Sequence, residues 1–215
     1  MSIANLEHRS YNFEVRAEKD EKHGSIIVGR PIVYESKTNL GEFDEIIKRG
    51  ALKNADLTDV RFLVNHDVSK IPLARSRKNN ENSTMQLIVD DDGMGIRVDL
   101  DTENNSDARS LYSAVQRGDV SGMSFMFAID GEQWSDLDSE HPTRSITSIS
   151  TVVEVSAVTF PAYDSTSINA RDSKCALENA RRALDNARHD NEAEIAKARE
   201  KAELEKLKIK FLMEV

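Results

Sequence analysis

Apolar and polar residues alternate along several short stretches of this chain, as they do in strands with one buried face. The alternation predicts strands at 11–18, 25–34, 61–67 and 144–163, a hairpin at 85–101 that turns at Asp92-Gly93, and a strand around 121–129. The connections between these strands are short. This pattern is typical of an antiparallel sheet or barrel.

Helical spacing of apolar residues occurs in fewer places. At 104–118, Ala108, Leu111 and Val115 share one helical face, with Asn or Ser to cap the start and a glycine to end the helix. A second short helix is expected at 43–56, with a break at its glycine. Helices are therefore expected to flank the strands rather than to dominate the fold.

The character of the chain changes near Ser165. Residues 169–215 are rich in Ala, Glu, Lys and Arg and contain no Gly or Pro. Their alanine stripe is interrupted by charges at Asp190 and Glu194, so the seam is too weak for a confident coiled coil. We therefore expect an α+β chain: a mostly antiparallel β-barrel with flanking helices at 1–168, followed by a charged helical appendage at 169–215.

The net charge, the lengths of the apolar runs and the cysteine count argue against several classes of function. The net charge of −9 argues against nucleic acid as the main partner, because phosphate binding needs a basic surface. No apolar run is long enough to span a membrane, and the first 20 residues lack the pattern of a signal peptide. With Cys175 as the single cysteine, neither an internal disulfide nor a cysteine-rich zinc site is expected, which suits a reducing cytosol.

The apolar strand "VSGMSFMF" keeps two hydroxyls, at Ser121 and Ser124. Side chains alternate between faces, so Ser121 is expected on the core face and Ser124 on the opposite one. A serine becomes a nucleophile when a base, usually a histidine, takes its proton. Of the five histidines, His66 alone follows an apolar strand ("FLVNHD"), whereas His8 is expected in a frayed terminus. His66 is either such a base or a half-buried histidine bonded to a backbone carbonyl.

Glu154 stands among valines and alanines in the middle of "STVVEVSAV". A carboxylate buried there is costly unless it is paired. Its partner is either a histidine, which would make Glu154 the third member of a triad with His66, or an arginine such as Arg97 or Arg144. Asp67 is a poorer partner for His66, because neighbouring strand residues face opposite ways.

Three segments, "FLVNHD", "GDVSGMSFMF" and "VEVSAVTFPAYDST", together resemble the prohead maturation proteases of tailed phages, of the lambdoid Hong Kong 97 type. The resemblance covers roughly 10–168 and lies in the order and spacing of the three blocks. That family is related in fold to the herpesvirus assemblins, so an assemblin-like barrel is implied, with His66 as base and Ser124 as nucleophile. Assemblins carry a second histidine on the strand after the serine. This chain has none there, and Glu154 is the expected substitute.

The resemblance implies a serine endopeptidase that works through an acyl-enzyme and needs no cofactor or metal. Backbone N–H groups around Thr159–Tyr163 are candidates for holding the oxyanion. In the family, the protease is packaged inside the prohead in the host cytoplasm, where it cuts the scaffold-like arm of the major capsid protein and then itself. The tail at 171–215 fits a segment that binds coat or scaffolding helices and is later removed. Assemblins are activated by dimerisation, so a homo-oligomer would fit as well.

Two other classes of function compete with this interpretation. In the first, the chain is a non-catalytic scaffolding or capsid-interaction protein, and its C-terminal tail makes the functional contacts. In the second, it hydrolyses a small ester or amide, but the G-x-S-x-G elbow of that class is absent. A metal hydrolase is weaker still, because no H-E-x-x-H occurs and "DDDG" at 90–93 reads as a hairpin turn.

Overall fold

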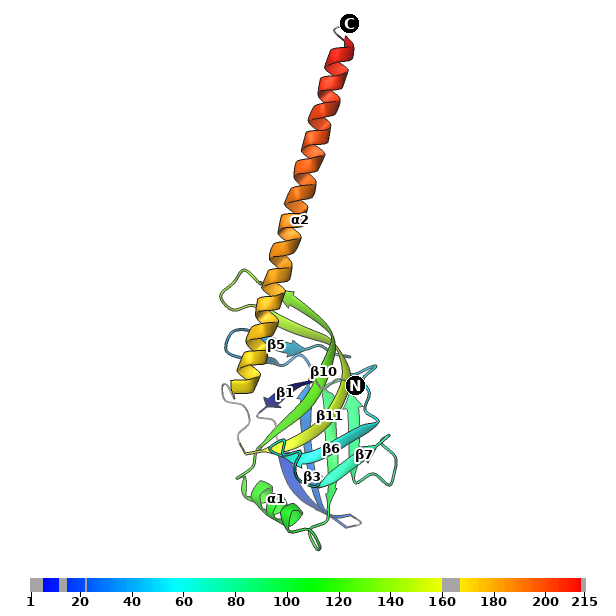
Figure 1. Cartoon of the computed structure of the whole chain (residues 1–215). Coiled ribbons are helices and arrows are strands. Elements are labelled where there is room, and N and C mark those ends of the chain that lie inside the picture. The colour runs from blue at the N-terminus through cyan, green and yellow to red at the C-terminus, as the bar shows by residue number, and fades with distance from the viewer. Residues whose placement is uncertain (1–5, 12–14, 22, 160–166, 214–215) are drawn as a thin grey trace. The chain divides into compact units, whose positions relative to one another are not determined.

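The structure, a computed structural model, describes residues 6–11, 15–21, 23–159 and 167–213 (Figure 1). The chain divides into two compact units, Met1–Ser173 and Lys174–Val215. Strands make up most of the first unit. The elements in chain order are β1 (Leu6–Tyr11), β2 (Val15–Asp20), β3 (Gly24–Val33), β4 (Lys37–Asn39), β5 (Asp44–Ile47), β6 (Asp59–Val64), β7 (Ala74–Arg77), β8 (Met85–Asp90), β9 (Gly93–Leu100), α1 (Ser106–Arg117), β10 (Gly122–Ser135), β11 (Thr143–Val158) and α2 (Ser167–Met213).

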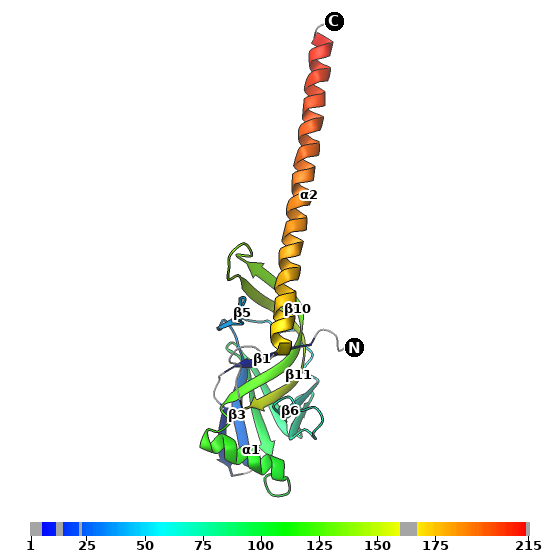
Figure 2. The ribbon, with the colours of Figure 1, turned by 60° about the vertical axis from the view of Figure 1, so that its left-hand side comes forward.

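The strands form two sheets. The larger has seven strands in the order β1-β10-β11-β5-β4, with β6 also pairing β11 and β7 pairing β6. Its central element is the long antiparallel pair of β10 and β11, which Figures 1 and 2 show lying side by side. Because β5 pairs with the first part of β11 and β6 with the last part, both parallel to it, one strand organises the sheet.

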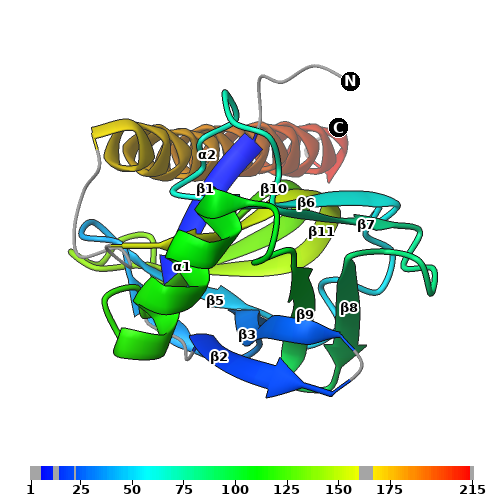
Figure 3. The ribbon, with the colours of Figure 1, turned by 90° about the horizontal axis from the view of Figure 1, so that it is seen from below.

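The smaller sheet has the order β2-β3-β9-β8 and lies against the larger one, with α1 beside them (Figure 3). One hydrophobic cluster fills the space between the sheets and extends to the buried face of α1. Its largest fully buried aromatic residues are Phe62, Phe125 and Phe127. Since β10 contributes two of these, the strand that carries Ser124 is anchored on its core side.

The structure confirms the α+β class, with strands dominant, but corrects the expected barrel. The described strands form two separate sheets, and no ladder between described residues closes them into a barrel. The helix expected at 43–56 is also wrong. Residues Asp44–Ile47 form β5, in which Glu45 and Ile47 are buried and their neighbours are less so. Pairing with β4 and β11 on both sides of β5 overrides the helical spacing of this segment.

Several local predictions are confirmed. The helix expected at 104–118 is α1, whose start is capped by Asn105 accepting from two backbone amides, and whose end is Gly118 at φ 81°. The hairpin of β8 and β9 forms, although its turn falls at Asp91 and Asp92. The apolar residues at 123, 125 and 127 are fully buried on one face.

The tail forms a helix as expected, the 47-residue α2. Among the described residues, no helix is both long enough and apolar enough to cross a membrane.

Candidate active site

Three elements bring the three sequence blocks together. Ser124 of β10 lies directly opposite Ser156 of β11, and Glu154 is two residues before Ser156 on the same face. β6 pairs parallel with β11 along this part, with Leu63 opposite Ser156. The chain leaves β6 at Val64, so His66 lies just beyond the strand end and beside both residues.

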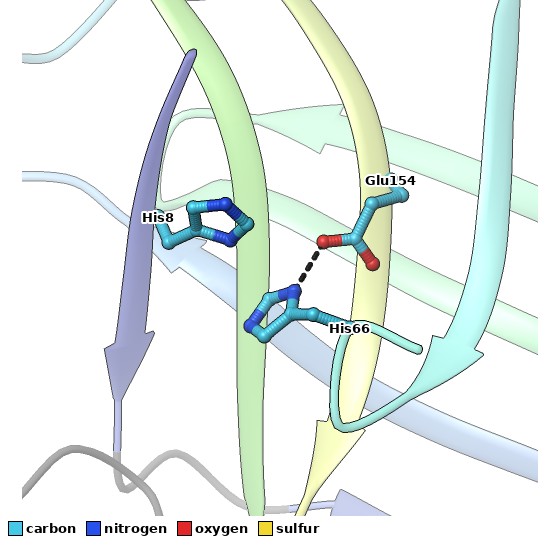
Figure 4. Close-up of side chains that lie close together, drawn as sticks. All are labelled: His8, His66 and Glu154. Atoms are coloured by element: carbon cyan, nitrogen blue, oxygen red, sulfur yellow. Dashed lines mark hydrogen bonds and ion pairs between the residues drawn. The ribbon is translucent and has the colours of Figure 1, made fainter. Parts of the chain in front are cut away.

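His66 links a hydroxyl to a carboxylate. Its Nε2 atom is 2.6 Å from Ser124 Oγ, and its Nδ1 atom forms a hydrogen bond with Glu154 Oε1 (Figure 4). Ser124 and Glu154 are buried, whereas the His66 side chain is 21% exposed. Carboxylate, imidazole and hydroxyl joined in this order can pass a proton from the hydroxyl to the ring and stabilise the charged ring.

The turn after β6 orients the His66 imidazole. Asn65 and His66 both have left-handed backbones, with φ 50° and 59°. Asn and His enter this region more often than most non-glycine residues, and each residue held there costs of order 1–3 kcal/mol. Thr159 N donates to Asn65 Oδ1 at 2.9 Å, and Asn65 N donates to Ala157 O at 3.0 Å. The turn is therefore tied to the end of β11, which fixes His66 relative to Glu154.

Ser156 is a further residue of this site, and its hydroxyl holds both partners. It donates to Glu154 Oε2 at 2.7 Å and accepts the His66 backbone N–H at 3.1 Å. Both Glu154 oxygens are thus used, one by the ring and one by the hydroxyl. The signal for Ser156 was present in the alternation of "VEVSAV", which places it on the face of Glu154.

The alternatives left open by the sequence are resolved for these side chains. Glu154 bonds to His66 and Ser156, while Arg97 pairs with Asp20 and Asp99. The ring nitrogens of His66 bond to side chains rather than to a backbone carbonyl.

Arg144, the other candidate partner of Glu154, also pairs elsewhere, with three other carboxylates. Asp67 accepts from the amide and hydroxyl of Ser69 at 3.1 and 2.5 Å, as befits a poorer partner for His66. Ser121 is not on the core face: it precedes β10 and is exposed.

The N-terminal segment also contributes to the site, which sequence reasoning missed. His8 lies in β1 rather than in a frayed end, and its ring meets the His66 ring edge-on, with centroids 4.6 Å apart (Figure 4). Ser10 Oγ donates to Ser124 Oγ at 2.8 Å, and Ser124 Oγ is 2.8 Å from the carbonyl oxygen of Arg9. "LEHRSY" is too polar to show strand periodicity clearly, so only pairing with β10 reveals its position.

A buried group of charges lies on the other face of the β1–β10 ladder. Arg9 bonds to Glu45 through Nε at 2.5 Å and Nη2 at 2.7 Å, and Arg144 bonds to Glu7 at 2.9 and 3.0 Å. Burial opposes the charge of Glu7, but Arg9 and Arg144 outweigh it and lower its pKa below the usual value. Burial likewise opposes the charge of Arg144, yet its carboxylate partners raise its pKa.

Three side chains at this site also form a group of potential metal ligands. His8, His66 and Glu154 offer ligand atoms within 4.8 Å of one another. His66 Nδ1 and Glu154 Oε1 already bond to each other, so metal binding at these atoms and orientation of the imidazole are alternatives. The expectation that no metal is needed stays a prediction.

The oxyanion-hole segment expected at Thr159–Tyr163 is described only at its first residue. The Thr159 amide is already used by the Asn65 side chain, and residues 160–163 lie outside the described residues.

Comparison with known proteins assigns the chain to a family. Residues 11–181 match the sequence model of the caudovirus prohead serine proteases, and the chain belongs to this family. The prohead protease of Enterobacteria phage HK97 is 30% identical over 172 residues, which are 78% of this chain and 69% of that protein. The structure of the bacteriophage T4 capsid assembly protease aligns with a TM-score of 0.41 and 11% identity, over 72% of this chain and 97% of that one. The chain is thus a peptidase of the prohead class, as its resemblance implied.

Proposed function

We propose that Ser124 and His66 are the catalytic nucleophile and base of a serine endopeptidase, with Glu154 as the third member of the triad. The observation that carries this proposal is the continuous chain Glu154–His66–Ser124, with one ring nitrogen on each partner. Membership of a serine protease family supports it. A structural histidine would need no buried carboxylate on one side and a buried hydroxyl on the other.

The proposed mechanism follows from these contacts. His66 Nε2 takes the Ser124 proton as Oγ attacks a peptide carbonyl, and the ring then protonates the leaving amine. The resulting acyl-enzyme is hydrolysed by water that the same nitrogen activates. Glu154 keeps the proton of the neutral ring on Nδ1, so that Nε2 is free to accept. Ser156 is a positioning residue, because it orients Glu154 and the His66 backbone.

We further propose that the chain cuts the scaffold-like arm of the major capsid protein, and itself, inside the prohead in the host cytoplasm. The family and the prohead protease of phage HK97 support this role. The proposed division of labour places the protease in residues 1–168 and a removable or partner-binding segment in 169–215. An assemblin-like fold and a homo-oligomer remain predictions that belong with this role.

The competing function is a scaffolding protein without catalysis. Co-expression of the chain with its coat protein distinguishes the protease from the scaffolding protein, with the lengths of both proteins followed on a gel. Native chain should shorten the coat protein and itself, whereas Ser124→Ala and His66→Ala should leave full-length bands. Ser121→Ala is the matched control, because Ser121 lies three residues away, is exposed, and should process like native chain. Unchanged processing by Ser124→Ala would refute the proposed nucleophile.

A further inference from the structure

Strand β1 covers the strand that carries the candidate nucleophile. It pairs antiparallel with β10 from Leu6 opposite Ala128 to Tyr11 opposite Met123, which places Ser10 directly opposite Ser124. The Ser124 side chain is completely buried, and its Oγ is 2.8 Å from the Arg9 carbonyl oxygen. Extended peptides commonly bind proteins by adding a strand to a sheet edge. Here β1 fills that place along β10.

The Arg9 side chain enters a binding site built by other parts of the chain. Its guanidinium makes two parallel bonds to the Glu45 carboxylate of β5, and it lies 5.7 Å from the centre of the Phe127 ring. Arg9 is 4% exposed and Glu45 1%. A fork of two hydrogen bonds to a buried carboxylate selects a guanidinium strongly over a neutral side chain.

The charges outside β1 call for a basic residue at this position. Outside β1, Glu45 and Glu132 share the single guanidinium of Arg144, so the buried Glu45 has no guanidinium of its own. A buried carboxylate is costly unless it is well paired, and Arg9 gives Glu45 a guanidinium of its own. Two residues earlier, Glu7 takes two bonds from Arg144. The site thus binds a basic residue and an acidic residue two positions before it.

The geometry points to a substrate site along β10 that takes extended peptides with a basic residue immediately before the cleaved bond, with Glu45 as the specificity residue. It also assigns Arg9–Ser10 as a bond that the chain cuts in itself. This inference rests on the proposed function, since it needs Ser124 as the nucleophile. While β1 is in place, it also keeps other peptides from Ser124.

The proposed cleavage step starts from two contacts of the Ser124 hydroxyl, one with His66 Nε2 and one with the Arg9 carbonyl oxygen. The Ser124 hydroxyl turns its proton toward His66 Nε2, and Oγ bonds to the Arg9 carbonyl carbon. The bond between the Arg9 carbon and the Ser10 nitrogen then breaks, and His66 gives the proton to that nitrogen. Water adds to the acyl carbon, the ester to Ser124 breaks, and residues 1–9 leave with a new carboxylate.

The first test follows the purified full chain over time by intact mass and N-terminal sequencing. The native chain should acquire a new N-terminus at Ser10, and Ser124→Ala should stay intact. Arg9→Gln should slow this cut at least a hundredfold. Arg109→Gln is the matched control: it removes the arginine of another Arg–Ser pair, exposed on α1, and should leave the rate at Ser10 unchanged.

The second test measures how much Glu45 contributes to specificity, as the ratio of kcat/KM for two peptides. Two peptides are compared as substrates of the full chain after incubation has released residues 1–9 and left β10 free: Leu-Glu-His-Arg-Ser-Tyr and the same sequence with Gln in place of Arg. The native chain should prefer the first at least a hundredfold in kcat/KM, and Glu45→Gln should reduce the preference to less than tenfold. Because a ratio is read, partial loss of folded protein in the variant does not imitate the result.

The outcomes separate the two levels of the proposal. If Ser124→Ala stops coat-protein processing but the native N-terminus never begins at Ser10, or Glu45→Gln keeps the full preference, the inference is wrong and the proposed function stands. If Ser124→Ala processes the coat protein and cuts itself as the native chain does, the proposed function fails, and the inference fails with it.

Discussion

Replacing Glu154 by Gln tests the proposed triad most directly, because it keeps the volume of the side chain and removes only its charge and one acceptor. Glu154 now accepts from His66 Nδ1 with one oxygen and from Ser156 Oγ with the other. Glutamine has a single acceptor oxygen. If that oxygen stays on Ser156, the amide NH₂ faces Nδ1 and forces the ring proton onto Nε2.

The expected loss follows from that geometry. A ring protonated at Nε2 cannot take the Ser124 proton, and with the other amide orientation the charged ring still lacks its carboxylate. Removing the charge in this position of a triad costs about 10⁴-fold in kcat where it has been tested, and we expect about 10³–10⁴-fold here. At 1.36 kcal/mol per tenfold, this corresponds to about 4–5.5 kcal/mol in the activation free energy.

The assay is the initial rate of coat-protein cleavage, measured by gel densitometry, with thermal unfolding of each variant to check the fold. Asp67→Asn is the control: it removes the carboxylate adjacent to His66 in sequence, which bonds to Ser69 and not to the ring, and should retain activity within about twofold of native. A Glu154→Gln variant that is folded and active within tenfold of native would refute the proposed role of Glu154.

Three further predictions concern stability, ionisation and metal dependence. Gly93→Ala should lower the free energy of unfolding by at least about 2 kcal/mol in denaturant unfolding, because the new Cβ would lie 2.0 Å from Ile32 O at a residue with φ 139°. Gly24→Ala is the control: no atom lies within 4 Å of its Cβ, so it should cost only about 1 kcal/mol. Equal costs for the two variants would contradict the predicted clash at Gly93. The hydrogen bonds from Arg30 lower the pKa of Asp90 to about 2, so an NMR titration should find its midpoint near that value. Stability from this pair should be present above the ordinary pKa and lost as pH falls toward 2, whereas a midpoint near 3.8 would contradict the pairing. Treatment with EDTA should leave cleavage unchanged, because both nitrogens of the proposed base already bond to protein groups; a loss restored by Zn²⁺ would favour the metal alternative.

Structural features that depend on residues close together in the sequence were predicted correctly from the sequence alone. The helix at 104–118 carries its own cap and its own terminating glycine, so its bounds follow from local chemistry. The hairpin of β8 and β9 is likewise closed by a short turn between alternating strands. The alternation around 123–127 placed the three apolar residues of the core on one face of β10 and Ser124 on the other. In each case the deciding interactions lie within a few residues.

Other features were decided by contacts between distant segments. Residues Asp44–Ile47 have helical spacing, but they pair with β11 and form a strand. This pairing buries Glu45 beside Arg144. His8 and Ser10 reach the site only because β1 pairs with β10, more than a hundred residues further along the chain. A polar strand has no periodic signal of its own, so such a position cannot be read from its sequence.

The candidate site shows the same division. The sequence by itself determined which groups were available: His66 after an apolar strand, a hydroxyl on the face of β10 opposite its core residues, and in Glu154 a carboxylate that needed a partner. Only the tertiary structure decided that this partner is His66 rather than an arginine. The physical reason is that the cost of a buried charge depends on its neighbours in space, and these are set by the register of β10, β11 and β6.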